Sequence, residues 1–310
     1  MVRARLALGA LLAVLVVVAA LGVAACGSSG ASGTGASGTG ASADGGAGER
    51  AVIVATTPIL GAIVRDAVGD AADVRVLMPN GGDPHEWRPS AKDVAELQSA
   101  DLVMQNGLGL EQGLQEAISQ ARDDGVPVFT ATDHVAVRPG DPHFWTDPSQ
   151  VARVVAALPA AVRAATGADI AASAAKAGKR LAALDAEIAD DFAKVPETAR
   201  NVVTGHESLG YLAARYGLAL TGAVTPSLSS QGQVSAAHLK QLEDAMSRAG
   251  VRVVFTETGL PNAVADAIVA QAGATLVQLG TEALPDDGTY ATYIRELARR
   301  MSSALANTGG

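Results

Sequence analysis

The sequence predicts an α/β protein of two lobes, each with a mostly parallel four-stranded sheet flanked by helices, joined by one long rigid helix. Three observations lead to this fold class. Short runs rich in β-branched residues alternate with helical patterns, and these runs fall into two groups of four. The two groups are separated by residues 149–194, which contain no strand pattern. Alternation of this kind is typical of parallel sheets in which helices connect successive strands.

Each strand and helix follows from these patterns. The predicted strands are 51–56, 74–77, 102–105, 126–129, 201–204, 218–223, 251–255 and 275–279. The predicted helices between them are 59–68, 91–100, 110–123, 235–249 and 262–272. Because open α/β sheets bind ligands beyond the carboxyl ends of their strands, we expect the functional side chains in the loops that follow strands.

One uninterrupted helical pattern, 169–194, joins the two groups of strands. It contains no proline, and its apolar side chains recur at spacings of three and four, which gives a single stripe of Leu181, Leu184, Ile188 and Phe192. At about 1.5 Å per residue this helix would be about 40 Å long. We therefore assign 50–166 to an N-terminal lobe, 167–195 to the linking helix and 196–310 to a C-terminal lobe, and we expect little hinge motion.

The N-terminus carries an export signal. Arg3 and Arg5 precede an apolar run over 6–21, which is shorter than the roughly 20 residues that a membrane-spanning helix needs. Residues 1–25 are therefore predicted to be a signal peptide. The ending Val23-Ala24-Ala25-Cys26 resembles the bacterial lipobox, which implies that Cys26 is lipidated. We expect an extracytoplasmic protein, lipid-anchored to the outer face of the bacterial cell membrane.

Composition defines the segment after Cys26 and the class of partner. Residues 26–49 are predicted to be a flexible tether, since 27–48 is almost entirely Gly, Ser, Ala and Thr. Cys26 is the only cysteine, so no disulfide can form within the chain. The net charge of −9, from 32 acidic and 23 basic residues, argues against nucleic acid as a partner and is compatible with a cationic ligand.

Two short segments are near copies and carry two of the five histidines and both tryptophans. They are Gly82-Asp83-Pro84-His85-Glu86-Trp87 and Gly140-Asp141-Pro142-His143-Phe144-Trp145. Proline fixes φ and removes a backbone donor, so each Asp-Pro-His step is a stiff turn that orients its histidine. A solvated surface turn would explain one such segment. Two copies favour a pair of fixed metal ligands, His85 and His143.

A third histidine, His206, follows a predicted strand directly, in Thr204-Gly205-His206-Glu207. This position puts it at the carboxyl edge of the second sheet, although the same residues also match a helix-capping segment. The remaining candidates, His134 and His238, are assigned no metal-binding role. His238 lies beside the apolar stripe of its predicted helix and is expected at the solvent or at a lobe edge.

In order along the chain, these segments resemble the zinc/manganese solute-binding lipoproteins of bacterial ABC importers. The resemblance also rests on Asn106-Gly107-Leu108-Gly109-Leu110-Glu111 and on Gly205-His206-Glu207-Ser208-Leu209-Gly210-Tyr211. It covers essentially the whole mature chain. It implies a monomeric binding protein, not an enzyme, that captures one Zn(II) between its lobes and delivers it to an ABC permease and its ATPase.

The resemblance also implies a set of four metal ligands: His85, His143, His206 and Glu282. Glu257, at the end of a predicted strand, is the rival for the carboxylate position. Three imidazoles and one carboxylate suit four-coordinate zinc, whereas Mn(II) favours more oxygen ligands. Many zinc-binding relatives have a long, His-rich loop before the second ligand, but here 133–141 is short, with His134 alone. A manganese-binding member of the same family is therefore the alternative.

Other functional classes fit the sequence less well. A zinc-dependent hydrolase needs an open coordination position and a general base, for which Glu207 or Glu257 would be candidates. The chain contains no His-Glu-x-x-His motif, and four protein ligands would leave no position for water. A metal-chaperone or adhesin lipoprotein is the remaining alternative, which the sequence does not separate from an importer component.

Overall fold

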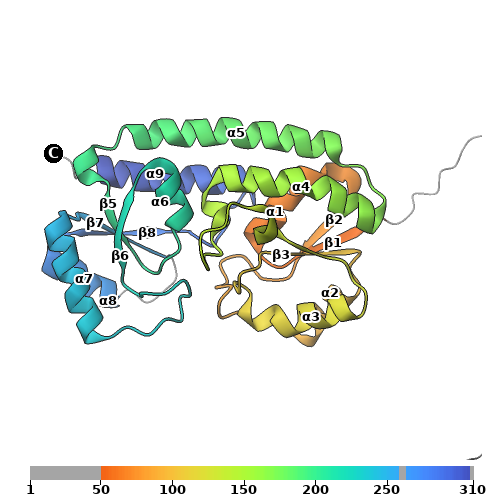
Figure 1. The fold of residues 1–310 in the computed structure, drawn as a ribbon, viewed down its shortest axis with the longest axis horizontal. Coiled ribbons are helices and arrows are strands. Elements are labelled where there is room, and N and C mark those ends of the chain that lie inside the picture. Colours follow the sequence, from red (N-terminus) through yellow and green to blue (C-terminus); the bar gives the residue numbers. More distant parts are fainter. Residues whose placement is uncertain (1–49, 258–262, 308–310) are drawn as a thin grey trace, which may run out of the picture. The chain divides into compact units, whose positions relative to one another are not determined.

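The computed structural model describes residues 50–257 and 263–307, and in both parts strands alternate with helices (Figure 1). The predicted signal peptide 1–25, the lipidation site Cys26 and the tether 26–49 lie outside the described residues. None of the helices in the described ranges combines the length and the apolar character that crossing a membrane would require.

Two parallel four-stranded sheets form the cores of the two lobes. The first contains β1 (Val52–Ala55), β2 (Asp73–Val76), β3 (Leu102–Gln105) and β4 (Val128–Thr130), in the order β2-β1-β3-β4. The second contains β5 (Asn201–Thr204), β6 (Ala219–Ala223), β7 (Val253–Glu257) and β8 (Thr275–Leu279), in the order β6-β5-β7-β8. The two lobes thus have the same topology, and the predicted fold class is confirmed.

Six helices of the described residues fall on predicted ranges, whereas the helices at 148–166, 210–216 and 290–306 were not predicted. The helices are α1 (Pro58–Val68), α2 (Ala91–Gln98), α3 (Gln115–Asp123), α4 (Pro148–Thr166), α5 (Ala171–Ala193), α6 (Gly210–Tyr216), α7 (Ala236–Ala249), α8 (Ala263–Ala272) and α9 (Tyr290–Ala306). Short 3₁₀ turns are η1 (Gly69–Ala71), η2 (Gln112–Leu114), η3 (Ala131–His134), η4 (Phe144–Thr146) and η5 (Glu197–Ala199). The prediction that a helix starts at 110 was wrong. Glu111 has φ of −86° and ψ of 63°, outside the helical region, and a 3₁₀ turn follows it, so α3 starts only at Gln115.

Helices cover both faces of each sheet, as buried parallel sheets require (Figure 1). Successive strand residues point to opposite faces, so Ile53 and Val54 belong to different apolar clusters. The cluster with Ile53 includes side chains of α1, α4, α5, α6 and α9 and of one face of both sheets. Smaller clusters lie under α2 and α3 in one lobe and under α7 and α8 in the other. A single apolar cluster therefore continues from one lobe into the other.

Close packing of α1 on the first sheet needs a glycine. A side chain at Gly61 would collide with Val76 of β2, so only glycine allows this approach. The N-terminus of α1 is set by Thr57, whose hydroxyl accepts a hydrogen bond from the backbone N–H of Leu60 at 3.3 Å. These contacts fix α1 on the sheet, and α1 in turn packs against α5.

Helix α5 is fastened to both lobes by polar contacts. In the first lobe, Arg180 forms an ion pair with Asp66 of α1 at 2.5 Å. In the second lobe, Asp185 accepts hydrogen bonds from the Arg215 guanidinium (Nε at 2.9 Å) and from the Tyr216 hydroxyl at 3.0 Å, both on α6. A helix with apolar and polar contacts to both lobes should resist their relative rotation, so little hinge motion remains the expectation.

Replacing Asp185 by alanine is expected to destabilise the protein by roughly 1–2 kcal/mol, because two donors on α6 lose their acceptor. Asp190→Ala is the matched control, since Asp190 is an exposed aspartate on the same helix. Urea unfolding of both variants measures the difference. Equal free energies of unfolding would contradict a structural role for the Asp185 contacts.

Candidate metal centre

Four side chains converge where the carboxyl ends of both sheets face each other. His85, His143, His206 and Glu282 each offer one ligand atom, and these atoms lie within 4.8 Å of one another. The first two are in loops after β2 and β4, and the other two follow β5 and β8. The three histidines are 5%, 0% and 2% exposed, in that order, and Glu282 is half-buried. The structure thus brings together all four residues of the predicted ligand set, two from each lobe.

The two copied turns share one local geometry. The carboxylate of Asp83 accepts a hydrogen bond from the backbone N–H of His85 at 2.8 Å, and Asp141 does the same for His143 at 2.9 Å. In each turn the aspartate lies two residues before its histidine and closes the turn through this hydrogen bond. This contact explains why the Asp-Pro-His sequence recurs: the aspartate sets the backbone from which the imidazole projects.

The two turns differ in what else their aspartates contact. Asp141 Oδ1 also lies 2.8 Å from the ring Nδ1 of His143, whereas Asp83 accepts from the Ser230 hydroxyl at 2.6 Å. An imidazole whose Nδ1–H is held by a carboxylate presents Nε2 as its free lone pair. Asp141 therefore orients the His143 ring, while Asp83 ties its loop to the other lobe.

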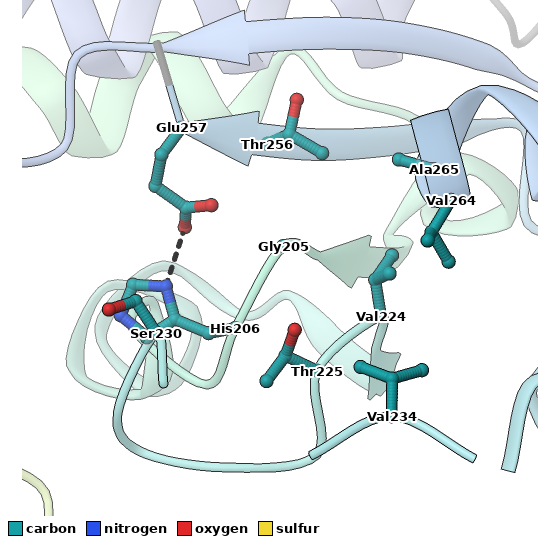
Figure 2. A pocket seen from close by; sticks show the side chains of 10 residues that line it. All are labelled: Gly205, His206, Val224, Thr225, Ser230, Val234, Thr256, Glu257, Val264 and Ala265. Atoms are coloured by element: carbon teal, nitrogen blue, oxygen red, sulfur yellow. Dashed lines mark ion pairs between the residues drawn. The ribbon is translucent and has the colours of Figure 1, made fainter. Parts of the chain in front are cut away.

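Glu257 orients His206 in the same manner, as Figure 2 shows. Its Oε1 lies 2.9 Å from Nδ1 of His206 and accepts a hydrogen bond from the Ser208 hydroxyl at 3.2 Å. A side chain at position 205 would collide with the Glu257 carboxylate in this position, so Gly205 leaves room for Glu257 to reach His206. A pocket of about 120 Å³ adjoins this pair. Glu257 thus contacts a ligand-set histidine and is not a member of the convergent group, whereas Glu282 is.

Donor geometry at the centre of the group fits a small divalent cation. Nε2 of His143 and Nε2 of His206 lie 3.3 Å apart. Two nitrogens that bind one tetrahedral Zn(II) at about 2.0–2.1 Å are separated by roughly 3.3–3.4 Å. Both ring nitrogens of His85 and Oε1 of Glu282 are buried without a hydrogen-bond partner among the described residues. Buried polar atoms are normally paired, and a cation would pair with these atoms simultaneously.

Burial and mutual charge shift the pKa values of the four groups in different directions. Burial, then the two neighbouring imidazoles, lowers the pKa of His85 to about 4, and burial also lowers the pKa of His143. Burial acts in the same direction on His206, but the Glu257 carboxylate outweighs it and raises the pKa of that ring. Burial raises the pKa of Glu282 to about 8. Near neutral pH, His85 and His143 are therefore neutral and Glu282 holds a proton.

The loop 106–111 is hydrogen-bonded to the His143 turn. The buried Glu111 carboxylate accepts hydrogen bonds from the Thr56 hydroxyl at 2.7 Å and from the backbone N–H of Asn106 at 2.5 Å, and burial raises its pKa. The Asn106 side chain in turn donates to the Pro142 carbonyl at 2.9 Å. This segment is therefore a scaffold for the His143 turn and lies outside the convergent group.

The other candidates from the sequence lie elsewhere. His134 is exposed and stacks on the Phe129 ring at 4.5 Å, and His238 is half-buried, with Nε2 at 2.9 Å from the Ala223 carbonyl oxygen. Trp145 is buried beside His143, but Trp87 packs against the apolar cluster under α2 and α3. The orienting role of Asp141 was missed from the sequence, although its place in the repeated Asp-Pro-His motif was the signal that could have found it.

Known proteins similar to this chain are named for the uptake or binding of zinc or manganese. A family model described as zinc-uptake complex component A, periplasmic, matches residues 53–304. The chain is 29% identical over 256 residues to the manganese-binding lipoprotein MntA of Halalkalibacterium halodurans, covering 80% of this chain and 85% of that protein. It is 28% identical over 306 residues to the high-affinity zinc uptake system protein ZnuA of Paracoccus denitrificans, covering 83% and 91%.

Among solved structures, the periplasmic zinc-binding protein TroA of Treponema pallidum matches with a TM-score of 0.72 at 22% identity. The match covers 83% of this chain and 99% of that one. At this level of identity the match supports the fold, which agrees with the two-lobed arrangement described above.

Glu282→Gln is expected to stabilise the metal-free protein at pH 7.5 and to have little effect at pH 5. The pKa of Glu282 is raised, so as the pH rises from 4.5 towards 8 the unfolded chain ionises while the folded chain keeps its proton, and folding loses stability. Glutamine avoids this loss, which amounts to on the order of 3 kcal/mol.

Thermal unfolding at both pH values, in the presence of a chelator, measures this effect. Glu116→Gln, at an exposed position of α3, is the control and should change neither value. A stabilisation by Glu282→Gln of equal size at pH 5 and pH 7.5 would rule out ionisation of Glu282 as its cause.

Proposed function

We propose that this chain, which belongs to the zinc-uptake complex component A family, is an extracytoplasmic solute-binding protein that captures one Zn(II) between its two lobes for an ABC importer. The observation that carries the proposal is the group of three buried imidazoles and one half-buried carboxylate, supplied by both lobes. The proposed ligands are His85, His143, His206 and Glu282. Asp141 and Glu257 hold two of the rings so that their Nε2 atoms face the cation.

Zinc is favoured over manganese by the donor set and by its spacing. Three nitrogens and one oxygen match zinc sites, and zinc also lies above manganese in the affinity order for nitrogen-rich sites. The 3.3 Å separation of the two Nε2 atoms equals the edge expected for a tetrahedral zinc site. Manganese is the alternative, supported by the relative named as a manganese-binding lipoprotein. A carboxylate that binds through both oxygens would supply part of the higher coordination number that manganese prefers.

Capture and release, and no chemical reaction, is the function that we infer for this centre. Four protein ligands in a tetrahedral arrangement leave no open position for a water nucleophile. Family membership supports an ABC permease with its ATPase as the partner. We further propose that lipidated Cys26 and the tether 26–49 anchor the lobes 50–166 and 196–310, joined by 167–195, outside the cell membrane as a monomer.

Zinc should raise the melting temperature of the wild-type protein, because a ligand bound only by the folded state at 1,000 times its dissociation constant adds about 4 kcal/mol of stability. His85→Ala and His143→Ala should each remove most of this rise. His134→Ala is the control, because His134 is an exposed histidine of the same lobe. Differential scanning fluorimetry with and without zinc measures the rise, and a full rise in either of the first two variants would refute the ligand assignment.

Zinc affinity should increase as the pH rises from 6 to 8. The cation binds neutral imidazole and ionised carboxylate, whereas the pKa values of metal-free Glu282 and His206 are raised, which favours their protonated forms. Zinc must displace these protons, so the dissociation constant should fall by up to about tenfold per pH unit for each proton released. Calorimetric titration in buffers of different ionisation enthalpy counts the protons, and an affinity independent of pH over this range would contradict the proposal.

A further inference from the structure

The backbone next to Glu282 is held by hydrogen bonds from both lobes. The Thr281 carbonyl oxygen accepts one hydrogen bond from the indole Nε1–H of Trp145 at 3.1 Å and another from the Tyr293 hydroxyl at 2.6 Å. Trp145 follows the His143 turn, and Tyr293 is on α9. All three residues are buried, at 5% exposure or less. Since the carbonyl of Thr281 and the N–H of Glu282 share one peptide plane, these donors fix the start of the Glu282 side chain.

Trp145 also contacts His143, a member of the convergent group. Its ring centroid lies 5.3 Å from that of His143, edge to face, with an interplanar angle of 63°. Its own backbone carbonyl accepts a hydrogen bond from the Tyr290 hydroxyl at 2.8 Å. Trp145, a residue of the first lobe, therefore packs on His143 of the same lobe and donates to the Thr281 carbonyl, in the peptide that precedes Glu282 of the second lobe.

The other flank of Glu282 is tied to the first lobe as well. The Asn80 side chain donates to the Leu284 carbonyl at 2.8 Å and accepts from the Leu284 backbone N–H at 2.8 Å. The side chain of Glu282 itself has no such restraint, because its buried Oε1 has no partner among the described residues. The position of this carboxylate consequently depends on how its backbone is held.

We propose that Trp145 is a positioning residue for metal capture: through the Thr281 carbonyl it holds Glu282 at the distance from His143 that a shared cation requires. The proposal deepens the zinc-binding function proposed above and rests on it. Holding the carboxylate in advance spares the conformational entropy that a free glutamate side chain would lose on binding. Trp87, at the equivalent place in the other copied turn, packs in an apolar cluster and has no corresponding role.

Trp145→Phe tests the proposal, because it keeps an aromatic ring but removes the N–H donor to Thr281. Zinc affinity, measured by competition with a chelator on the full mature chain, should fall by about 10–100-fold, as for other residues that support metal ligands. Trp87→Phe, the matched control in the other copied turn, should leave the affinity unchanged. The decisive measurement repeats Trp145→Phe in a Glu282→Ala background, where it should cost no more than about twofold.

The outcomes separate this inference from the proposed function. An equal loss of affinity with and without Glu282 would mean that Trp145 does not act through that carboxylate, and would overturn the inference while zinc binding stands. Failure of the wild type to bind zinc would overturn the proposed function instead.

Should Trp145→Phe prove too unstable to titrate, Tyr293→Phe removes the other donor to the same carbonyl and should show the same dependence on Glu282. An unchanged zinc affinity in Tyr293→Phe would then overturn the inference.

Discussion

Four ionisable side chains from two lobes meet at one place, three of them buried and Glu282 half-buried, and the protein does not supply every one of them with a partner. Leaving a buried polar group unpaired costs roughly 1–3 kcal/mol, and burying an unpaired charge costs more. The raised pKa of Glu282 and the lowered pKa of His85 express this cost, because each group favours its neutral form where it lies. A divalent cation would compensate all four groups at once, so the same arrangement that weakens the metal-free fold creates affinity for a metal.

Such a group is useful only if the two lobes keep a fixed separation. The apolar cluster that runs through both lobes and the polar contacts of α5 to α1 and α6 provide that frame. Within the frame, three of the four side chains are held by neighbours of their own: Asp141 for the His143 ring, Glu257 for the His206 ring, and the contacts at Thr281 for Glu282. Metal capture in this protein is therefore expected to involve small loop adjustments and no large movement of the lobes.

Much of this arrangement could be predicted from the sequence. All eight strands, the linking helix and the parallel topology follow from hydrophobic patterns and from the rule that helices connect parallel strands. The family inferred from the motifs is confirmed by the match over residues 53–304. The histidines could be singled out because proline-stiffened turns and strand ends are recognisable locally.

The remainder depends on contacts between distant residues. Glu282 carries no local signal and entered only through the family resemblance. The two tryptophans are equivalent in sequence, but their contacts differ. Trp145 packs on His143 and donates to the Thr281 carbonyl of the other lobe, whereas Trp87 packs against the apolar cluster under α2 and α3. α3 also starts later than predicted because a loop precedes it. That loop is held by the buried Glu111 carboxylate, which accepts a hydrogen bond from the Thr56 hydroxyl, 55 residues away in the chain.

The central claim is that one cation is bound by these four side chains, and anomalous diffraction at the zinc edge tests it most directly. Crystals of the zinc-loaded protein should give a single strong peak per chain, about 2.0–2.2 Å from a nitrogen of His85, His143 and His206 and from an oxygen of Glu282. A peak outside this group, a second peak of equal height, or a zinc ion that Glu282 does not reach would contradict it.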